Sequence, residues 1–192
     1  MSKVSFGVKP YLFPMPVLMI ATYCEDGRVD VMNMAWGGIC DNNKVALNIT
    51  ESHMTAKNIK ERGAFTISIA DVDHLAESDF FGTASANRMP DKFERTGMHA
   101  LKSSYVDAPV IEEYPVTLEC QVASIQKDEE GFRVVGEIVN VLVDDKVLDA
   151  NGKVDPTKIN AFAFDQFKNG YYKIGEKVGD AWKSGAKFMN KE

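Results

Sequence analysis

The chain of 192 residues has few cysteines and few histidines, three of each. Cys24, Cys40 and Cys120 are scattered, odd in number and without a CxxC spacing, which argues against a disulfide framework and against a zinc site. The histidines are also too dispersed to suggest a metal cluster. We therefore expect reduced thiols, as in a cytoplasmic protein, and no metal.

Long apolar runs are missing as well. The longest one near the start, PMPVLMIA, is too short to span a bilayer, and no basic segment with a small-residue cleavage site flanks it. The motifs GxGxxG, GxxxxGK[ST], HExxH and GxSxG are absent too, which argues against a Rossmann site, a P-loop, a zinc protease and a nucleophile elbow. The sequence predicts neither a membrane segment nor a signal peptide.

Positive charge is the minority sign. There are 22 Lys and Arg against 28 Asp and Glu, the formal net charge is −6, and no block of basic residues occurs. This composition argues against nucleic acid or an anionic membrane surface as the main partner. Hydrophobic residues make up 45% of the chain, which is ordinary for a globular protein, and the length suits one domain over residues 1–192.

The pattern that is present consists of strands joined as hairpins. The turn signal Asp26-Gly27 separates two apolar runs, and Gly63 follows a short amphipathic segment as a helix-ending residue. Strands are expected at 16–23, 28–36, 44–50, 64–70, 115–127 and 132–143. Helices are expected at 54–62, 71–82 and 89–97, and a loop with a short helix at 171–188. Hairpins without regular strand–helix alternation indicate an antiparallel barrel with a few helical insertions.

Ser52, His53 and Thr55 stand where the helix at 54–62 begins. The first N–H groups of a helix have no intrahelical partner, and hydroxyls beside them can bind a phosphate. The alternative is that these side chains simply cap the helix. From the residues alone, both readings stay open.

Two other stretches are candidates for a binding site. In NMAWGGIC, residues 33–40, glycines follow a strand and Trp36 supplies apolar surface, although an ordinary strand end with a core tryptophan is the simpler reading. In SANRMPDKF, residues 85–93, Ser85 and Lys92 could reach an anion, while the alternative is a polar loop leading to a helix capped by Asp91.

Taken together and in order, these pieces resemble the flavin reductase-like family, and within it the flavoredoxin group. The resemblance covers nearly the whole chain. It is carried by FPMPVLMIATYCEDGRVDVMNMAWGGIC, SHMTAKNIKERGAFTISI, SDFFGTAS, DKFERTGM, APVIEEYPVTLECQV and YYKIGEKVGDAW. It implies a mainly β, antiparallel, Greek-key type FMN-binding split β-barrel with a few short helices, assembled as a homodimer with FMN near the subunit interface.

The resemblance also implies which residues bind FMN. The isoalloxazine ring would lie along Asn33, Met34, Ala35 and Trp36. The phosphate would lie against Thr50, Ser52, His53 and Thr55, approached by Ser85 and Lys92 from the same subunit or from the other one. Tyr171 or Tyr172 would cover the site.

Two departures from the family pattern concern the phosphate. Relatives often carry a basic residue at the position of Thr50, and a glycine at the position of Ala86. Neutralisation of the phosphate would then fall on the helix N-terminus, His53 and Lys92.

The implied function is an FMN-dependent oxidoreductase that moves electrons from NAD(P)H through FMN to flavin or a protein acceptor. No catalytic side chain is assigned, because the cofactor itself carries hydride and single electrons. The alternative is an FMN electron-transfer protein with little NAD(P)H activity of its own. A third reading is a binding module without flavin on the same barrel.

Overall fold

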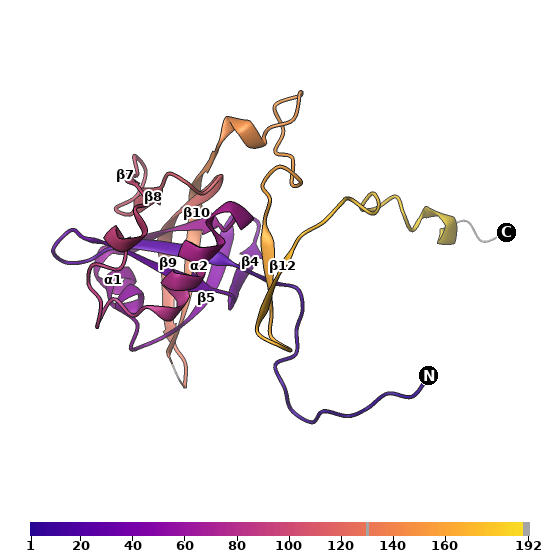
Figure 1. Ribbon diagram of the computed structural model, residues 1–192, viewed down its shortest axis with the longest axis horizontal. Coiled ribbons are helices and arrows are strands. Elements are labelled where there is room, and N and C mark those ends of the chain that lie inside the picture. The colour runs from indigo at the N-terminus through magenta and orange to yellow at the C-terminus, as the bar shows by residue number, and fades with distance from the viewer. Residues whose placement is uncertain (130, 190–192) are drawn as a thin grey trace.

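The computed structural model describes residues 1–129 and 131–189 (Figure 1). Within them the largest element is a seven-stranded antiparallel sheet in the order β3-β2-β6-β9-β10-β5-β4. Its strands are β2 (Leu18–Tyr23), β3 (Val29–Met34), β4 (Gly37–Asp41), β5 (Lys44–Thr50), β6 (Ala64–Ile69), β9 (Val116–Lys127) and β10 (Gly131–Val143).

The remaining strands form two small sheets. A three-stranded sheet has the order β1-β11-β12, and β7 pairs with β8. These strands are β1 (Met15–Pro16), β7 (Ala100–Lys102), β8 (Pro109–Ile111), β11 (Phe162–Asp165) and β12 (Gly170–Lys173). The helical elements are α1 (Met54–Arg62), α2 (Leu75–Thr83) and the 3₁₀ turns η1 (Val72–His74), η2 (Glu94–Thr96), η3 (Asp145–Val147) and η4 (Ala186–Phe188).

The large sheet curls on itself around one apolar core. Met32 of β3, Ile20 of β2 and Leu47 of β5 pack in the same cluster, although β3 and β5 lie near opposite ends of the strand order. Gly136 of β10 makes room for the ring of Phe65 of β6 in this core, because a Cβ there would lie 2.4 Å from that ring. Mainly antiparallel structure with few short helices is thus confirmed.

Both faces of β2 and β3 are buried. Alternation sends Ile20 into the barrel core, while Met19 and Val31 pack in a second cluster with Phe81 of α2 and Phe162 of β11. This second cluster fixes α2 and the β11–β12 hairpin against the outer face of β3. The C-terminal end of β3 therefore lies between the barrel, α2 and this hairpin.

The structure confirms the predicted turn at Asp26-Gly27 and the predicted helix end at Gly63. Gly27 has φ 85° in the hairpin between β2 and β3, and Gly63 ends α1 at φ 65°. At the start of the next helical segment, Asp71 accepts the backbone N–H of His74 at 2.9 Å. The helix predicted at 71–82 begins as the turn η1 and continues as α2.

Three predictions about elements are wrong. The segment 89–97 forms turns and the short η2 rather than a helix, although Gly97 does end it at φ 70°. The strand predicted at 28–36 ends at Met34, and Gly37–Asp41 forms a separate edge strand, β4. Tyr171 and Tyr172 lie in β12 rather than in a loop.

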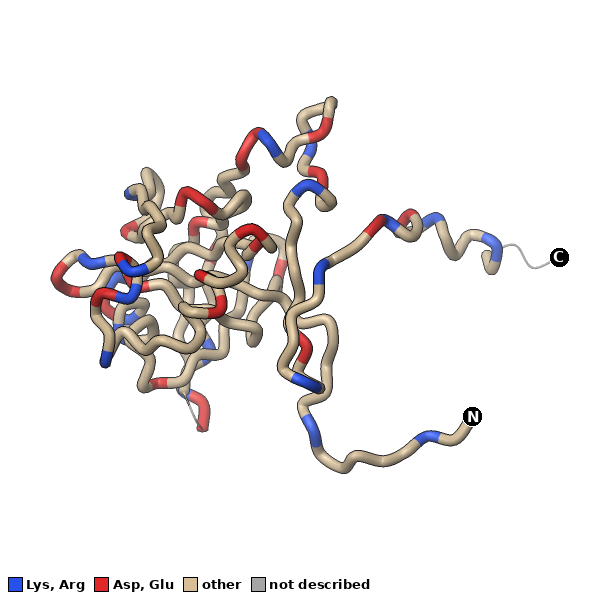
Figure 2. Tube along the Cα trace, in the orientation of Figure 1, with Lys and Arg blue, Asp and Glu red and all other residues tan. Residues whose placement is uncertain are grey.

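Both ends of the described chain extend away from the barrel (Figure 1). Basic and acidic residues are interspersed along the trace, as Figure 2 shows. No helix in the described part of the chain combines the length and the apolar content needed to cross a bilayer.

Candidate functional site

A continuous groove lies at the C-terminal end of β3. It consists of two adjoining cavities of about 640 Å³ and 500 Å³, a size typical of small-molecule sites. Both cavities are lined by Met32, Asn33, His53, Gly82 and Thr83. We call the larger one the apolar cavity and the smaller one the polar cavity.

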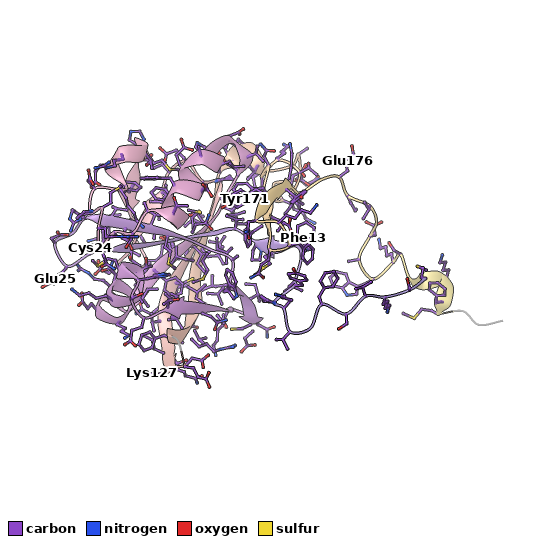
Figure 3. The ribbon with its side chains drawn as sticks, turned by 60° about the horizontal axis from the view of Figure 1, so that its bottom comes forward. Phe13, Cys24, Glu25, Lys127, Tyr171 and Glu176 are labelled. Carbon is purple, nitrogen blue, oxygen red and sulfur yellow. The ribbon has the colours of Figure 1, made fainter. Side chains whose placement is uncertain are left out.

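Aromatic side chains from four separate segments surround the apolar cavity. Trp36 follows β3, Phe132 belongs to β10, and Phe164 and Tyr171 face each other across the β11–β12 hairpin. Figure 3 labels Tyr171 where this hairpin meets the barrel. Trp36 is 48% exposed, so it is not the core tryptophan of the simpler reading. Flat walls of this kind suit a planar aromatic ligand.

Asn33 is held by α2. Its Nδ2 donates to the carbonyl oxygen of Ser78 at 2.9 Å, which provides the partner that a polar side chain needs in apolar surroundings. The helix comes this close because residue 82 is glycine; a Cβ there would lie 3.1 Å from Cβ of Asn33. The side chain of Asn33 is thereby fixed at the junction of the two cavities.

Tyr171 lines the apolar cavity, and Tyr172 does not. The Tyr171 hydroxyl donates to Oδ1 of Asp79 at 2.9 Å. Burial, and then Asp79, raises the pKa of Tyr171 to about 12, so the phenol stays neutral in ordinary buffers. Tyr172 points the other way along the strand and packs edge-on against Phe13, with ring centres 5.6 Å apart.

The N-terminus of α1 opens at the polar cavity without a side-chain cap. The capping alternative for Ser52 and Thr55 is therefore not realised. The Thr55 hydroxyl donates instead to Oδ2 of Asp30 at 2.6 Å, and the side-chain amide of Asn87 donates to the carbonyl oxygen of Ser52 at 2.8 Å. In the first turn, the backbone N–H of Ala56 donates to the carbonyl oxygen of His53 at 3.1 Å, whereas those of Met54 and Thr55 have no acceptor among the described residues and remain for a ligand.

Lys92 brings a buried cation to the polar cavity. The residue is 3% exposed, its ammonium lies 3.1 Å from Oδ1 of Asp30, and it donates to the carbonyl oxygen of Ala84 at 3.3 Å. Desolvation beside the cavity lowers the pKa of His53, and the nearby Lys92 lowers it further. An anion entering here would meet Lys92, the start of α1 and a neutral imidazole.

The groove unites all ten residues predicted to bind a cofactor. The apolar cavity is lined by Met34, Ala35, Trp36 and Thr50, the polar cavity by Ser52, Thr55, Ser85 and Lys92, and both by Asn33 and His53. Asp91 caps no helix here; its carboxylate pairs with Arg95 at 2.9 Å on the surface.

Sequence reasoning missed Asp30, Asp79, Phe132 and Phe164. Asp30 had a readable signal, because it shares a face of its strand with the apolar residues Met32 and Met34. A charge on a buried face requires a partner. The other three come together only through the folding of distant segments.

Comparison with known families matches residues 11–158 to the family described as "Flavin reductase like domain". Among solved structures, the flavoredoxin of Desulfovibrio vulgaris (Miyazaki F) is 31% identical, with a TM-score of 0.90 over 96% of this chain and 100% of that chain.

Two further structures are less similar in sequence. The flavoredoxin from Methanosarcina acetivorans is 22% identical, with a TM-score of 0.89 over 98% of this chain and 100% of that chain. A Shewanella frigidimarina structure whose description names a split barrel domain is 23% identical, with a TM-score of 0.76 over 86% of this chain and 84% of that chain. At such identities the similarity shows the fold, and it confirms the predicted split β-barrel.

Proposed function

The chain belongs to the flavin reductase-like family, and from this premise we propose that it binds FMN in the groove and acts as an oxidoreductase. The observation that carries the proposal is the two-part groove. Its aromatic half suits a flat ring system, and its polar half contains the buried ammonium of Lys92 beside an uncapped helix start. FMN has the same division, with a planar isoalloxazine at one end and a phosphate at the other.

The residues present fit each end of FMN. Asn33, Met34, Ala35 and Trp36 would lie along the ring, with Asn33 held in place by Ser78. Lys92, Ser52, His53 and Ser85 would surround the phosphate, together with the backbone N–H groups at the start of α1.

Thr50 and Thr55 fill more limited parts in this arrangement. Thr50 stands at the end of β5 on the wall of the apolar cavity, where it would approach the ribityl chain. Thr55 would contribute its backbone N–H, because its hydroxyl hydrogen already goes to Asp30.

Bound FMN would supply hydride and single-electron chemistry. The chain would bind and orient it: the aromatic walls exclude water from one side of the ring, and Tyr171 contributes a neutral hydroxyl at the edge of the cavity. We assign no acid–base side chain to the reaction.

Electrons would come from NADH or NADPH and pass to free flavin or to a protein acceptor. The alternative is an FMN electron carrier with little NAD(P)H activity. It is favoured by the 31% identity to a protein named flavoredoxin. The family membership favours the reductase, and we take that as the leading function.

We also propose that the protein forms a homodimer and that it is located in the cytoplasm. The N-terminal arm, residues 1–12, and the C-terminal segment, residues 174–189, leave the barrel (Figure 1). They expose large apolar side chains, among them Phe6, Val178 and Trp182. Exposed apolar surface of this kind marks interaction sites, and a second copy of the chain would cover it. Light scattering after size exclusion should report about twice the mass of one chain.

The direct test is the visible spectrum of the purified protein before and after anaerobic addition of NADH or NADPH. We expect flavin absorbance that bleaches on a timescale compatible with turnover. Bound flavin that neither dinucleotide reduces would reject the reductase and leave the electron carrier. A protein that stays colourless after FMN addition would reject both.

A further inference from the structure

The polar cavity contains an anion as well as a cation. Asp30 is 1% exposed and lines this cavity together with Lys92. Its Oδ1 lies 3.1 Å from the ammonium, and its Oδ2 accepts the hydroxyl of Thr55. The place proposed for a phosphate is thus already occupied in part by a carboxylate.

The buried charges of this cavity cancel. Asp30 and Lys92 carry one charge of each sign, and the lowered pKa of His53 leaves its imidazole neutral near pH 7. Arg88 lines the cavity but is exposed to solvent, where its charge is screened. A phosphate therefore approaches a site without net buried charge.

Lys92 is free to exchange one anion for another. An ammonium has three N–H donors, and one of them goes to the carbonyl oxygen of Ala84. The ion pair with Asp30 at 3.1 Å is the only polar contact of Oδ1 of Asp30 among the described residues. A ligand oxygen that approached Lys92 would therefore have to share the ammonium with this carboxylate or replace it.

We propose that Asp30 is an internal counterion that competes with the FMN phosphate for Lys92 and so keeps the flavin exchangeable. This inference rests on the proposed function and deepens it. Without Asp30, the empty site would hold an unpaired buried cation, which is strongly unfavourable, and a phosphate would relieve it on binding. With Asp30 present, Lys92 is already paired, so binding of the phosphate relieves no unpaired charge. The carboxylate also repels the phosphate at short range. An exchangeable flavin suits a reductase that releases reduced flavin to another protein.

A merely structural role predicts the opposite sign. If Asp30 served only to hold Lys92 and Thr55 in place, its removal would loosen both groups and weaken FMN binding. The direction of the change therefore separates the two roles.

The experiment is a binding titration of FMN and of riboflavin, which lacks the phosphate, against the wild type, Asp30→Asn, Lys92→Met and the double variant. We expect Asp30→Asn to bind FMN at least about tenfold more tightly, with slower release, and riboflavin unchanged. We also expect the double variant to bind FMN at least about tenfold more tightly than Lys92→Met alone, because the unopposed carboxylate is gone.

Circular dichroism and melting curves establish that each variant is folded. If Asp30→Asn does not fold, the comparison of Lys92→Met with the double variant still gives the sign, since the double variant leaves no unpaired buried charge. Unchanged or weaker FMN binding on removal of Asp30 overturns the counterion role while the proposed function stands. A wild type that binds neither flavin overturns the proposed function, and this inference with it.

Discussion

The two halves of the groove are built on different physical principles. The apolar cavity is formed by aromatic side chains from segments far apart in the chain, and two of its polar groups, Asn33 and Tyr171, are already hydrogen-bonded to α2. The polar cavity is formed around a buried ion pair, Asp30 and Lys92, beside an uncapped helix. The first half would recognise a ligand by shape and the second by charge. Substitutions should therefore separate FMN from riboflavin in one half and affect both alike in the other.

The largest effect is expected from Lys92→Met. It removes the buried cation and leaves Asp30 unpaired, so FMN affinity should fall about 10- to 150-fold, since hydrogen bonds to charged groups contribute about 1.5–3 kcal/mol. Riboflavin affinity should change only a few-fold, about 1 kcal/mol or less. Fluorescence titration with the two flavins measures both. Lys102→Met, at an exposed lysine of β7, is the matched control and should alter neither. An equal loss for both flavins would show that the halves are not separable.

Trp36→Ala tests the other half. Removing the half-exposed indole at the mouth of the apolar cavity should weaken FMN and riboflavin to the same extent, about three- to tenfold, as aromatic contacts contribute about 0.5–1.5 kcal/mol beyond their buried area. The same titrations measure it. Tyr105→Ala, an exposed aromatic on the loop between β7 and β8, serves as control. Weakening confined to FMN would place the phosphate, rather than the ring, near Trp36.

A smaller effect is expected at the start of α1, where two hydroxyls differ in their partners. Ser52→Ala should lower FMN affinity several-fold, about 1 kcal/mol, and leave riboflavin unchanged. Thr55→Val removes the hydroxyl that donates to buried Asp30 and should lower the free energy of unfolding by about 1–3 kcal/mol. Denaturant unfolding measures the second change. If Thr55→Val left stability intact and reduced FMN binding alone, its hydroxyl would contact the phosphate directly.

The smallest effect concerns pH. The pKa of His53 is lowered in the folded protein, so the unfolded chain binds the proton more readily. The contribution of His53 to the free energy of unfolding is therefore lost as the pH falls below about 6.5. In ligand-free protein, His53→Gln should therefore reduce the fall in melting temperature between pH 7 and pH 5. Glu113 raises the pKa of His99 on the surface, so His99 contributes below about pH 6.5 and loses its contribution as the pH rises. His99→Gln should therefore increase the fall in melting temperature between pH 7 and pH 5. Parallel shifts in both variants would contradict this assignment.

Much of the fold was predictable because its signals are local. Asp26-Gly27 marks the hairpin between β2 and β3, and Gly63 takes the left-handed conformation that ends α1. Edge strand β4 was missed because two glycines and an aspartate carry no strand pattern, and it forms because β5 offers it free backbone groups. The helix expected at 89–97 did not form, and Lys92 there lies in a turn.

The composition of the groove was predictable only in part. The ten residues that the family resemblance implied do line the two cavities. Their individual contacts followed no local signal. Thr55 donates to Asp30 rather than standing free, and Tyr171 faces the cavity while Tyr172 faces Phe13. Alternation along a strand predicts that two neighbours point apart, but not which of them points inward.

By itself, the sequence determined the succession of hairpins, the place where the first helix begins and ends, and the absence of dinucleotide-binding and phosphate-loop motifs. These features depend on residues that are neighbours in the chain. Only the tertiary structure decided that Asp30 meets Lys92, and that α2 and the β11–β12 hairpin close on the end of β3. Those contacts depend on how the sheet curls, because curling brings strands from its opposite ends around one core and sets the distance between side chains that no local pattern connects.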